Sequence, residues 1–315
     1  MTISTATVSV VIPTRYRSDL VHRAVDSALK QTFRNIEVVV VIDGPDPATS
    51  NSLGTIHDSR LRVIALEESV GGAEARNRGV RAARGKWIAF LDDDDEWLPE
   101  KIEKQVNRAG ETKEHNLVLG CKFIERTENG DRVLPLRTPD EDENISEYLY
   151  CPKGFSLGEG FVQTSTLFTQ RALLLSIPFV SGLKCGQETT WLLKVAQDAN
   201  ARIVIISDVL AIFHDDQRRQ RTSAAPAWRP LYKWAENNPK YFTRKAYSFF
   251  VATSCATYAA KAKEPPAVFI ELFKSCLTNG APTPKCIVLF LCRALLPLNF
   301  RRAAGKALSG RRVSS

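Results

Sequence analysis

The sequence predicts an α/β protein with a doubly wound mixed sheet and a helical C-terminal appendage. Two continuous runs of β-branched residues, at 8–12 and 36–42, are typical of strands buried on both faces of a sheet. Amphipathic segments alternate with such runs over the first 95 residues. From about residue 226 onward the β-branched runs disappear and helical patterns dominate, which indicates a separate helical region.

A strand, a helix and a second strand begin the chain as a βαβ unit. Apolar residues recur at three- and four-residue spacing over about 20–29, which predicts a helix with one apolar face, capped by Ser18 or Asp19. Because the two flanking strands are expected to be parallel, the crossover should be right-handed.

The alternation continues with a strand near 61–66, a helix over about 73–83 and a strand at 87–91 that ends in four aspartates. Ligands of open α/β sheets bind outside the carboxyl ends of the strands. We therefore expect residues 13–17, 43–46 and 92–95 to meet at one edge of the sheet.

The second half of the domain is more mixed. We expect a helix to about residue 107, a strand near 117–124, an exposed acidic loop or helix at 140–147, a helix at 191–196 and strands at 203–206 and 209–213. Helices are then predicted at 232–235, 244–262 and 268–277. The expected domains are 1–225, in two halves (1–100 and 101–225), and a helical region, 226–315, with a basic tail.

Charge is distributed unevenly along the chain. The net charge of +8 arises entirely after Glu271, the last acidic residue, so the body of the protein is neutral and a nucleic-acid partner is not expected. The eight basic residues that follow it are Lys274, Lys285, Arg293, Arg301, Arg302, Lys306, Arg311 and Arg312.

The apolar stretch at 286–298 is too short and too interrupted to span a bilayer. Two interpretations stay open: a helix that lies on an anionic membrane surface, or a helix packed on the body with a solvated basic tail. The seven scattered cysteines contain no C-x-x-C pair and no signal peptide is visible. We expect a cytoplasmic protein, with the inner face of the plasma membrane as its candidate surface.

The acidic run from Asp92 to Asp95 is the strongest chemical signal. Neighbouring carboxylates repel one another and raise each other's pKa, so a neutralising partner is expected. Mg²⁺ or Mn²⁺ commonly binds between one or two carboxylates and substrate phosphates. The alternatives are a solvated acidic turn or a cluster favoured by the dipole of the helix that follows.

Five segments together resemble the family-2 glycosyltransferases of GT-A fold. They are VSVVIPT (8–14), ALKQT (28–32), EVVVVIDG (37–44), GAEARNRG (72–79) and AFLDDDDEW (89–97), in the family's order and spacing. The resemblance extends over about residues 7–222. It implies a nucleotide-diphosphate sugar donor, a glycan or lipid-linked glycan acceptor, and a Mn²⁺ or Mg²⁺ cofactor. Residues 1–100 would then form a donor half and residues 101–225 an acceptor half.

The resemblance implies particular donor contacts. Pro13, Thr14 and Arg15 would line the nucleotide pocket, and Asp43 would bind the base or ribose, although Asp-Gly-Pro-Asp is itself a turn signal. Arg76 and Asn77 come from the Ala-Arg-Asn-x-Gly block. Arg15, Arg17 and Arg76 can offset the charge of a diphosphate.

In the acidic run, Asp92 and Asp94 match the D-x-D motif. This implies a ribose contact for Asp92, a metal ligand in Asp94 and a helper ligand in Asp95. Asp93 takes the variable position and, on an extended segment, would point the other way and tolerate substitution. His214, in FHDDQRRQRTS (213–223), would be a metal ligand or a diphosphate contact, with Arg218 or Arg221 near the phosphates; a solvated basic loop is the alternative.

The acceptor side is implied by two further segments. Gln163 and Thr164, in FVQTSTLF (161–168), would contact the acceptor, unless this is an ordinary half-buried strand. In GQETTWLLKVA (186–196), Glu188 stands where the family has its catalytic Asp, and Gln187 replaces the preceding Glu. A carboxylate there can act as general base, or can simply interact with the helix dipole.

The predicted reaction is therefore an inverting glycosyl transfer, in cell-surface polysaccharide or glycolipid synthesis. A sugar nucleotidyltransferase is one alternative, but the loop after the first strand lacks the glycines such an enzyme needs. A catalytically silent protein that binds nucleotide sugars or a membrane surface is another, supported by the departure at Glu188.

Overall fold

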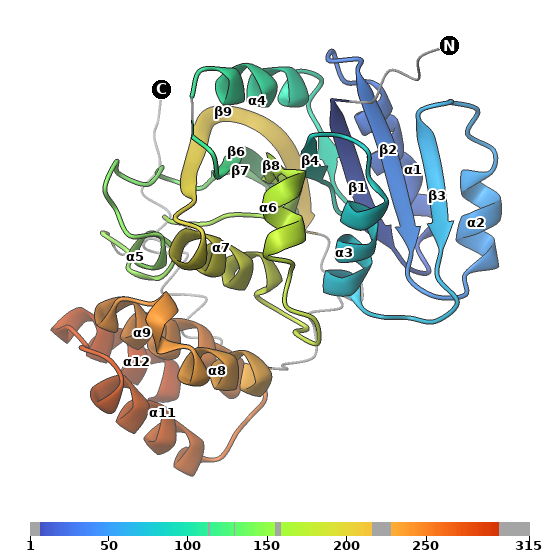
Figure 1. Cartoon of the computed structure of the whole chain (residues 1–315). Coiled ribbons are helices and arrows are strands. Elements are labelled where there is room, and N and C mark those ends of the chain that lie inside the picture. Colours follow the sequence, from blue (N-terminus) through green and yellow to red (C-terminus); the bar gives the residue numbers. More distant parts are fainter. Residues whose placement is uncertain (1–6, 113, 129, 155–158, 216–227, 296–315) are drawn as a thin grey trace. The chain divides into compact units, whose positions relative to one another are not determined.

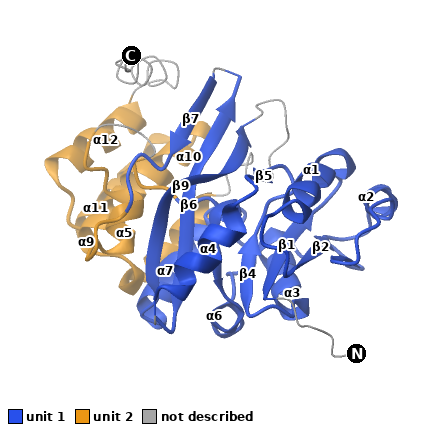
Figure 2. Ribbon diagram, turned by 90° about the horizontal axis from the view of Figure 1, so that it is seen from above, with its two compact units in different colours: residues 1–138, 162–219 blue, residues 139–161, 220–315 orange. Residues whose placement is uncertain are grey.

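The computed structural model of the chain describes residues 7–112, 114–128, 130–154, 159–215 and 228–295. The chain divides into two compact units: unit 1 comprises residues 1–138 and 162–219, and unit 2 comprises 139–161 and 220–315 (Figure 2). Residues 139–161, which the sequence placed in the acceptor half, thus group with the C-terminal helices. Thr243 and Lys245 donate hydrogen bonds to Glu147 at 2.9 and 2.8 Å, which ties this segment to them.

Unit 1 contains a mixed sheet flanked by helices (Figure 1). Its strands are β1 (Val8–Thr14), β2 (Ile36–Ile42), β3 (Leu61–Ala65), β4 (Trp87–Phe90), β5 (Glu96–Trp97), β6 (Leu117–Thr127), β7 (Gly130–Leu134), β8 (Phe168–Gln170) and β9 (Arg202–Asp215). Its helices are α1 (Ser18–Leu29), α2 (Pro47–Leu53), α3 (Gly72–Ala82), α4 (Lys101–Gly110), the 3-10 turn η1 (Thr164–Thr166), α6 (Arg171–Ser176) and α7 (Gln187–Asp198).

The sheet order is β3-β2-β1-β4-β8-β6-β9-β5, with β7 paired to β6. The pairs among β1 to β4 are parallel, whereas β8 is antiparallel to both β4 and β6. In the β1–β2 pair, Thr14 lies opposite Ile42, so these two strands end level with each other. The residues that follow them therefore leave the sheet side by side.

Helices cover both faces of the sheet, which confirms the predicted α/β class. Val10 and Val38 share one hydrophobic cluster with Val25 of α1 and Ile102 of α4. On the opposite face, side chains of β2 pack against Ala75 of α3. Alternate residues of each parallel strand are thus buried on opposite sides, as a continuous β-branched run requires.

Three local predictions were wrong or incomplete. Helix α1 begins at Ser18, one residue earlier than the expected caps allow, because the carbonyl of Arg17 accepts the first helical bonds from Leu20 and Val21. The two strands expected at 203–206 and 209–213 form one strand, β9, with an irregular register against β6. Helix α2 was not predicted; the side chain of Asp46 caps it and Pro47 is its first residue.

Unit 2 is helical, as the sequence predicts. It contains α5 (Ile145–Tyr150), α8 (Trp228–Asn237), the 3-10 turn η2 (Pro239–Tyr241), α9 (Arg244–Phe250), the π-turn η3 (Val251–Cys255), α10 (Ala256–Lys261), α11 (Pro266–Thr278) and α12 (Pro284–Leu295). The helix expected at 244–262 is continuous but carries the π-turn in its middle. Within the described ranges, no helix is both long enough and apolar enough to cross a bilayer.

Candidate active site

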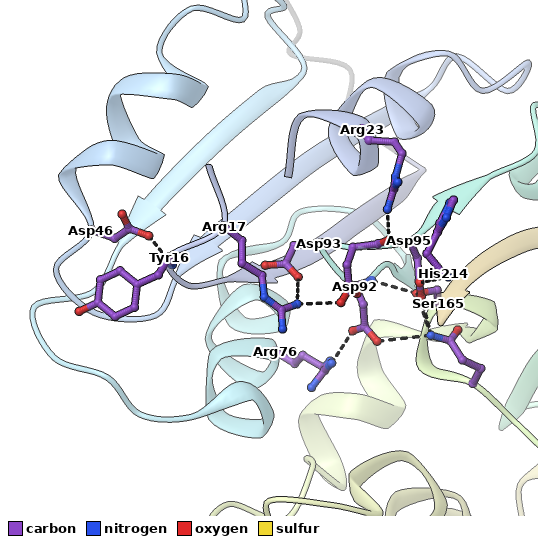
Figure 3. A network of polar contacts seen from close by, with 12 residues as sticks. Tyr16, Arg17, Arg23, Asp46, Arg76, Asp92, Asp93, Asp95, Ser165 and His214 are labelled. Carbon is purple, nitrogen blue, oxygen red and sulfur yellow. Dashed lines mark hydrogen bonds and ion pairs between the residues drawn. The ribbon is translucent and has the colours of Figure 1, made fainter. Parts of the chain in front are cut away.

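The loops after β1 and β4 meet at the carboxyl edge of the sheet, as predicted. Arg17 Nη1 lies 2.7 Å from Asp93 Oδ1 and 2.8 Å from Asp94 Oδ2, so one guanidinium bridges two carboxylates (Figure 3). Burial opposes the charge of Arg17, but the aspartates outweigh it and raise the pKa of the guanidinium. Arg17 is the partner that neutralises this part of the acidic run.

The loop after β2 is joined to the loop after β3. Asp43 accepts hydrogen bonds from the Ser69 hydroxyl at 2.9 Å and from the backbone amides of Val70 and Gly71 at 2.7 and 3.0 Å. Arg15 Nη1 donates to the same Ser69 hydroxyl at 2.8 Å, which brings in the loop after β1. Asp43 therefore holds the segment that leads into α3, where Gly71 adopts a φ of 83° that favours glycine.

Tyr16 lies at the outer end of this region. Its backbone amide donates to Asp46 Oδ2 at 2.6 Å, and its φ of 54° is unusual for a residue other than glycine. The ring is exposed, and the Arg15 guanidinium lies 5.0 Å from its centroid. Pro13 and Thr14, which end β1, are half-buried and buried respectively.

The four aspartates form a turn and not an extended segment. The amide of Asp95 donates to the carbonyl of Asp92 at 3.1 Å. Because the backbone turns, the alternation expected for a strand is lost, and the prediction that Asp93 points away from Asp94 was wrong. Burial raises the pKa of Asp93 to about 6, while Arg17 acts in the opposite direction.

Asp95 is completely buried beneath the turn. Its Oδ2 accepts hydrogen bonds from Gln163 Nε2 and the Ser165 hydroxyl, both at 2.6 Å, and its Oδ1 accepts from the His214 amide at 3.3 Å. Ser165 also accepts a bond from the Asp92 amide at 2.9 Å. Burial and the neighbouring aspartates raise the pKa of Asp95 well above its usual range. This carboxyl group anchors the turn to η1 and β9.

His214 is half-buried at the end of β9. Its Nε2 lies 3.0 Å from Glu96 Oε1, and burial, assisted by the positive charge of Arg23, lowers its pKa. Arg23 reaches the same region from α1 and donates to the backbone carbonyl of Asp94. Arg218 and Arg221, suggested as phosphate contacts, lie outside the described residues.

Arg76 joins the acidic turn to the start of α7. Its Nη2 donates to Asp92 Oδ1, and its Nη1 donates to Gln187 Oε1 at 2.8 Å. Asn77, its neighbour on α3, lies away from these contacts: it is buried and exchanges two 3.0 Å hydrogen bonds with the backbone of Phe179. Arg76 therefore lies at the candidate site, whereas Asn77 holds α3 to the backbone of Phe179.

Glu188 is the second residue of α7, directly after Gln187. Gly186, the residue before the helix, has a φ of 67°, a conformation that glycine adopts without strain. Burial raises the pKa of Glu188. The charge of Arg76 lowers this pKa and the charge of Asp92 raises it, so the carboxyl group is close enough to both residues for their charges to act on it. A carboxylate with a raised pKa is suited to accept a proton near neutral pH.

The expected ligands of a metal ion differ in their surroundings. Asp94 keeps part of its side chain exposed beside Arg17, whereas Asp95 is buried and His214 faces Glu96. In the part of the chain that the structure describes, no group of three or more His, Cys, Asp or Glu side chains is arranged to hold a metal ion. Oxygen atoms of Asp94 and Asp92 are chemically suited to Mg²⁺ or Mn²⁺ together with substrate phosphates.

Sequence reasoning missed Ser165 and Arg23. Ser165 lies in the Thr-Ser-Thr of η1, where nothing in the sequence distinguishes a hydroxyl that binds a buried carboxylate from one exposed to water. Arg23 lies among the polar positions of an amphipathic helix, so its contact with the acidic turn depends on how α1 packs beside β5.

Residues 9–171, more than half of the chain, match the family model described as glycosyl transferase family 2. The chain belongs to glycosyl transferase family 2. This confirms the resemblance seen in the sequence and makes the protein a glycosyltransferase. Neither the nucleotidyltransferase nor the silent binding protein is favoured.

Relatives of this family-2 glycosyltransferase are bacterial. It is 28% identical over 217 residues to the amylovoran biosynthesis glycosyltransferase AmsB of Erwinia amylovora, a match that covers 65% of this chain and 69% of AmsB. It is 38% identical over 100 residues to the Escherichia coli UDP-Glc:alpha-D-GlcNAc-diphosphoundecaprenol beta-1,3-glucosyltransferase WfaP. That match covers 32% of this chain and 40% of WfaP.

Solved structures show the same fold. TarS of S. aureus, residues 1–349 in complex with UDP-GlcNAc, superposes with a TM-score of 0.66 at 20% identity, over 98% of this chain and 93% of TarS. The mannosyltransferase PcManGT of Pyrobaculum calidifontis, in complex with GDP-Man and Mn²⁺, gives a TM-score of 0.53 at 19% identity, over 98% and 82% of the two chains. The GT-A-like fold predicted for this family-2 member is confirmed.

Proposed function

We propose that this family-2 glycosyltransferase moves a sugar from a nucleotide-diphosphate sugar to an acceptor hydroxyl, with inversion at the anomeric carbon. The observation that carries the proposal is the bridge made by Arg76, which binds Asp92 of the acidic turn and Gln187 at the start of α7. Glu188 follows Gln187 in α7, and the charges of Arg76 and Asp92 act on its carboxyl group, which supports its proposed role as general base.

The nucleotide is proposed to bind at the loops after β1 and β2. Asp43 shapes this region by holding residues 69–71, and Arg15, tied to Ser69, supplies positive charge. The exposed ring of Tyr16 offers a surface on which a base can stack. That TarS is solved with UDP-GlcNAc and PcManGT with GDP-Man supports a nucleotide-sugar donor.

A Mn²⁺ or Mg²⁺ ion fits the exposed side of the acidic turn. Asp94 would be its principal ligand, and Asp92 would bind the donor ribose. When bound, such an ion would offset negative charge on the departing diphosphate. Asp95 and His214 remain proposed helpers, but in the present contacts Asp95 supports the turn from beneath. The Mn²⁺ in the PcManGT complex is consistent with this assignment.

Glu188 is proposed to take the proton of the acceptor hydroxyl as its oxygen attacks the anomeric carbon. Because the pKa of Glu188 is raised, its carboxylate is a stronger base toward the weakly acidic hydroxyl of the acceptor. Arg76 and Arg17 would stabilise negative charge that develops on the leaving diphosphate, and Gln163 and Thr164 would border the acceptor. Most of the acceleration would then come from positioning and electrostatic stabilisation.

The acceptor is proposed to be a growing cell-surface polysaccharide or a lipid-linked glycan. AmsB is a polysaccharide biosynthesis enzyme by name, and WfaP acts on a diphosphoundecaprenol-linked sugar. We accordingly propose a cytoplasmic location, peripheral on the inner face of the plasma membrane, with the cationic tail as one attachment.

A donor screen with purified protein tests the proposal. A panel of UDP-, GDP- and dTDP-sugars is offered with membrane lipid extract, and transfer is followed by mass spectrometry with Mn²⁺, Mg²⁺ or EDTA. Glu188→Gln should lower kcat by roughly a hundredfold to ten-thousandfold, and Asp94→Ala should remove the metal response. Asp26→Asn, an exposed change on α1, is the matched control. Full activity of both variants, or turnover that persists in EDTA, would contradict the mechanism.

A further inference from the structure

Helix α12 has an apolar outward side. Val288, Leu291 and Leu295 recur at spacings of three and four residues and are 57%, 44% and 74% exposed. Cys286 and Phe290, on the other side of the helix, are buried. A helix side that faces water normally carries polar residues, so the composition of this side does not match an aqueous surrounding.

The charged residues of α12 are partly buried and form hydrogen bonds within unit 2. Lys285 Nζ donates to the carbonyl oxygen of Pro152 at 2.7 Å, and Arg293 Nε donates to the Thr257 hydroxyl at 3.1 Å. These two are the charged residues of the helix. The charged side chains of α12 are therefore held by contacts within the unit, whereas Val288, Leu291 and Leu295 are exposed.

Helix α11 of the same unit also exposes large apolar side chains. Phe273 of α11 and Phe290 of α12 have ring centroids 5.3 Å apart, so the two helices are in contact. Ile270 and Leu277, which lie before and after Phe273 on α11, are exposed. In the described part of unit 1, by contrast, exposed large apolar residues are scattered over separate loops, strands and one helix.

Charge indicates what covers this surface. The sequence after α12 contains Arg301, Arg302, Lys306, Arg311 and Arg312, and no acidic residue follows Glu271. Apolar side chains next to a cluster of cations suit an anionic lipid surface. A second copy of the chain would instead bring the same cationic sequence against its own, which is electrostatically unfavourable.

We propose that α12 lies on an anionic bilayer, with Val288, Leu291 and Leu295 in the interfacial layer. The helix, which ends as a described element at Leu295, is too short to span the membrane. The proposal rests on the peripheral membrane location proposed above and names the helix that would contact the lipid; it concerns lipid binding and not glycosyl transfer.

Vesicle flotation with the full-length protein tests this surface. The probe is phosphatidylethanolamine vesicles with about one third phosphatidylglycerol, compared with pure phosphatidylcholine. The triple variant Val288→Ser, Leu291→Ser, Leu295→Ser should reduce the bound fraction by at least about tenfold. The control is Leu175→Ser on α6, which alters a leucine of similar exposure, 45%, and should bind like the native protein.

Salt and oligomeric state separate the outcomes. Binding by the native protein should weaken as salt rises, because cations on anionic headgroups are screened, whereas the loss caused by the triple variant should remain at high salt. Unchanged binding by a variant that melts like the native protein would overturn the proposal. Failure of the native protein to bind either kind of vesicle would also overturn it. So would a native dimer that the triple variant dissociates while lipid binding stays unchanged. Transfer to a water-soluble acceptor, measured in parallel, reports on the glycosyltransferase proposal independently.

Discussion

Arg76 illustrates how a single side chain can organise a site at the residue scale. Its guanidinium binds Asp92 with one terminal nitrogen and Gln187 with the other. A planar fork can hold two acceptors in fixed directions, whereas a lysine ammonium is a point charge on a flexible stem. The distance between the acidic turn and α7 therefore depends on the shape of this residue as well as on its charge.

We expect Arg76→Lys to lower kcat/KM by roughly tenfold to a hundredfold, because a small displacement of Glu188 from the donor weakens catalysis strongly. Arg78→Lys is the matched control, since Arg78 lies on the same helix, is exposed and pairs with Glu74. Steady-state kinetics of both variants would check this. Equal losses in the two would argue against a bridging role for Arg76.

Lys101 is a fully buried lysine beneath the site. Its Nζ donates to Gln105 Oε1 at 2.7 Å and lies 4.0 Å from the centroid of the Trp97 ring. Trp97 in turn donates to the carbonyl of Ser165 at 2.6 Å. Burial lowers the pKa of Lys101 to about 8.

This lowered pKa predicts a pH dependence of stability. Between pH 8 and about 10.5 the folded protein has already released the proton that the unfolded chain still binds, so stability must rise with pH across this window. The unfolding free energy of the native protein should gain about 3 kcal/mol relative to Lys101→Met over that range. Urea unfolding of both proteins at pH 8 and pH 10 measures the difference. A constant difference would show that folding does not lower the pKa of the buried amine.

At the scale of the element, α3 is pressed closely onto the parallel strands. A Cβ atom added at Gly79 would lie 2.4 Å from Val11 Cγ1 and 3.2 Å from Val41 Cγ2. The glycine in the Ala-Arg-Asn-x-Gly block is thus needed for packing, since it lets the helix that carries Arg76 approach the sheet.

Gly79→Ala should therefore destabilise the fold by about 1–3 kcal/mol through overpacking, and should lower activity by displacing α3. Gly110→Ala is the opposite case, because that glycine ends α4 with open space around it. It should be neutral or stabilising by up to about 1 kcal/mol. Thermal unfolding of the two variants gives the comparison, and equal destabilisation would rule out the packing explanation.

At the scale of the whole molecule, charge and composition separate along the chain. The body up to Glu271 is neutral, and the excess positive charge follows it. The sheet and the candidate site belong to unit 1, whereas α12, with its exposed apolar side, belongs to unit 2. This division fits a chain in which one unit carries the chemistry and the other supplies the proposed lipid contact.

The sequence by itself determined the fold class, the family and which strand-end loops meet at the candidate site. Buried parallel strands produce continuous β-branched runs, and strand order then brings loops such as those containing Arg15 and Asp94 to one edge. These features are consequences of local pattern and topology, so the order of the residues is enough to predict them. The position of Glu188 was also recognisable, although it departs from the family's Asp.

Only the tertiary structure decided how individual side chains are used. A four-residue turn placed Asp93 beside Arg17 and Asp95 beneath the site, and α3 packing turned Asn77 toward Phe179. Likewise, the sequence left open whether the α12 segment packs on the body or lies on a membrane surface. In the structure, one side of α12 is buried and the other side is exposed. The physical reason is shared: hydrogen bonds and packing between residues far apart in sequence select one orientation among several that the local sequence permits.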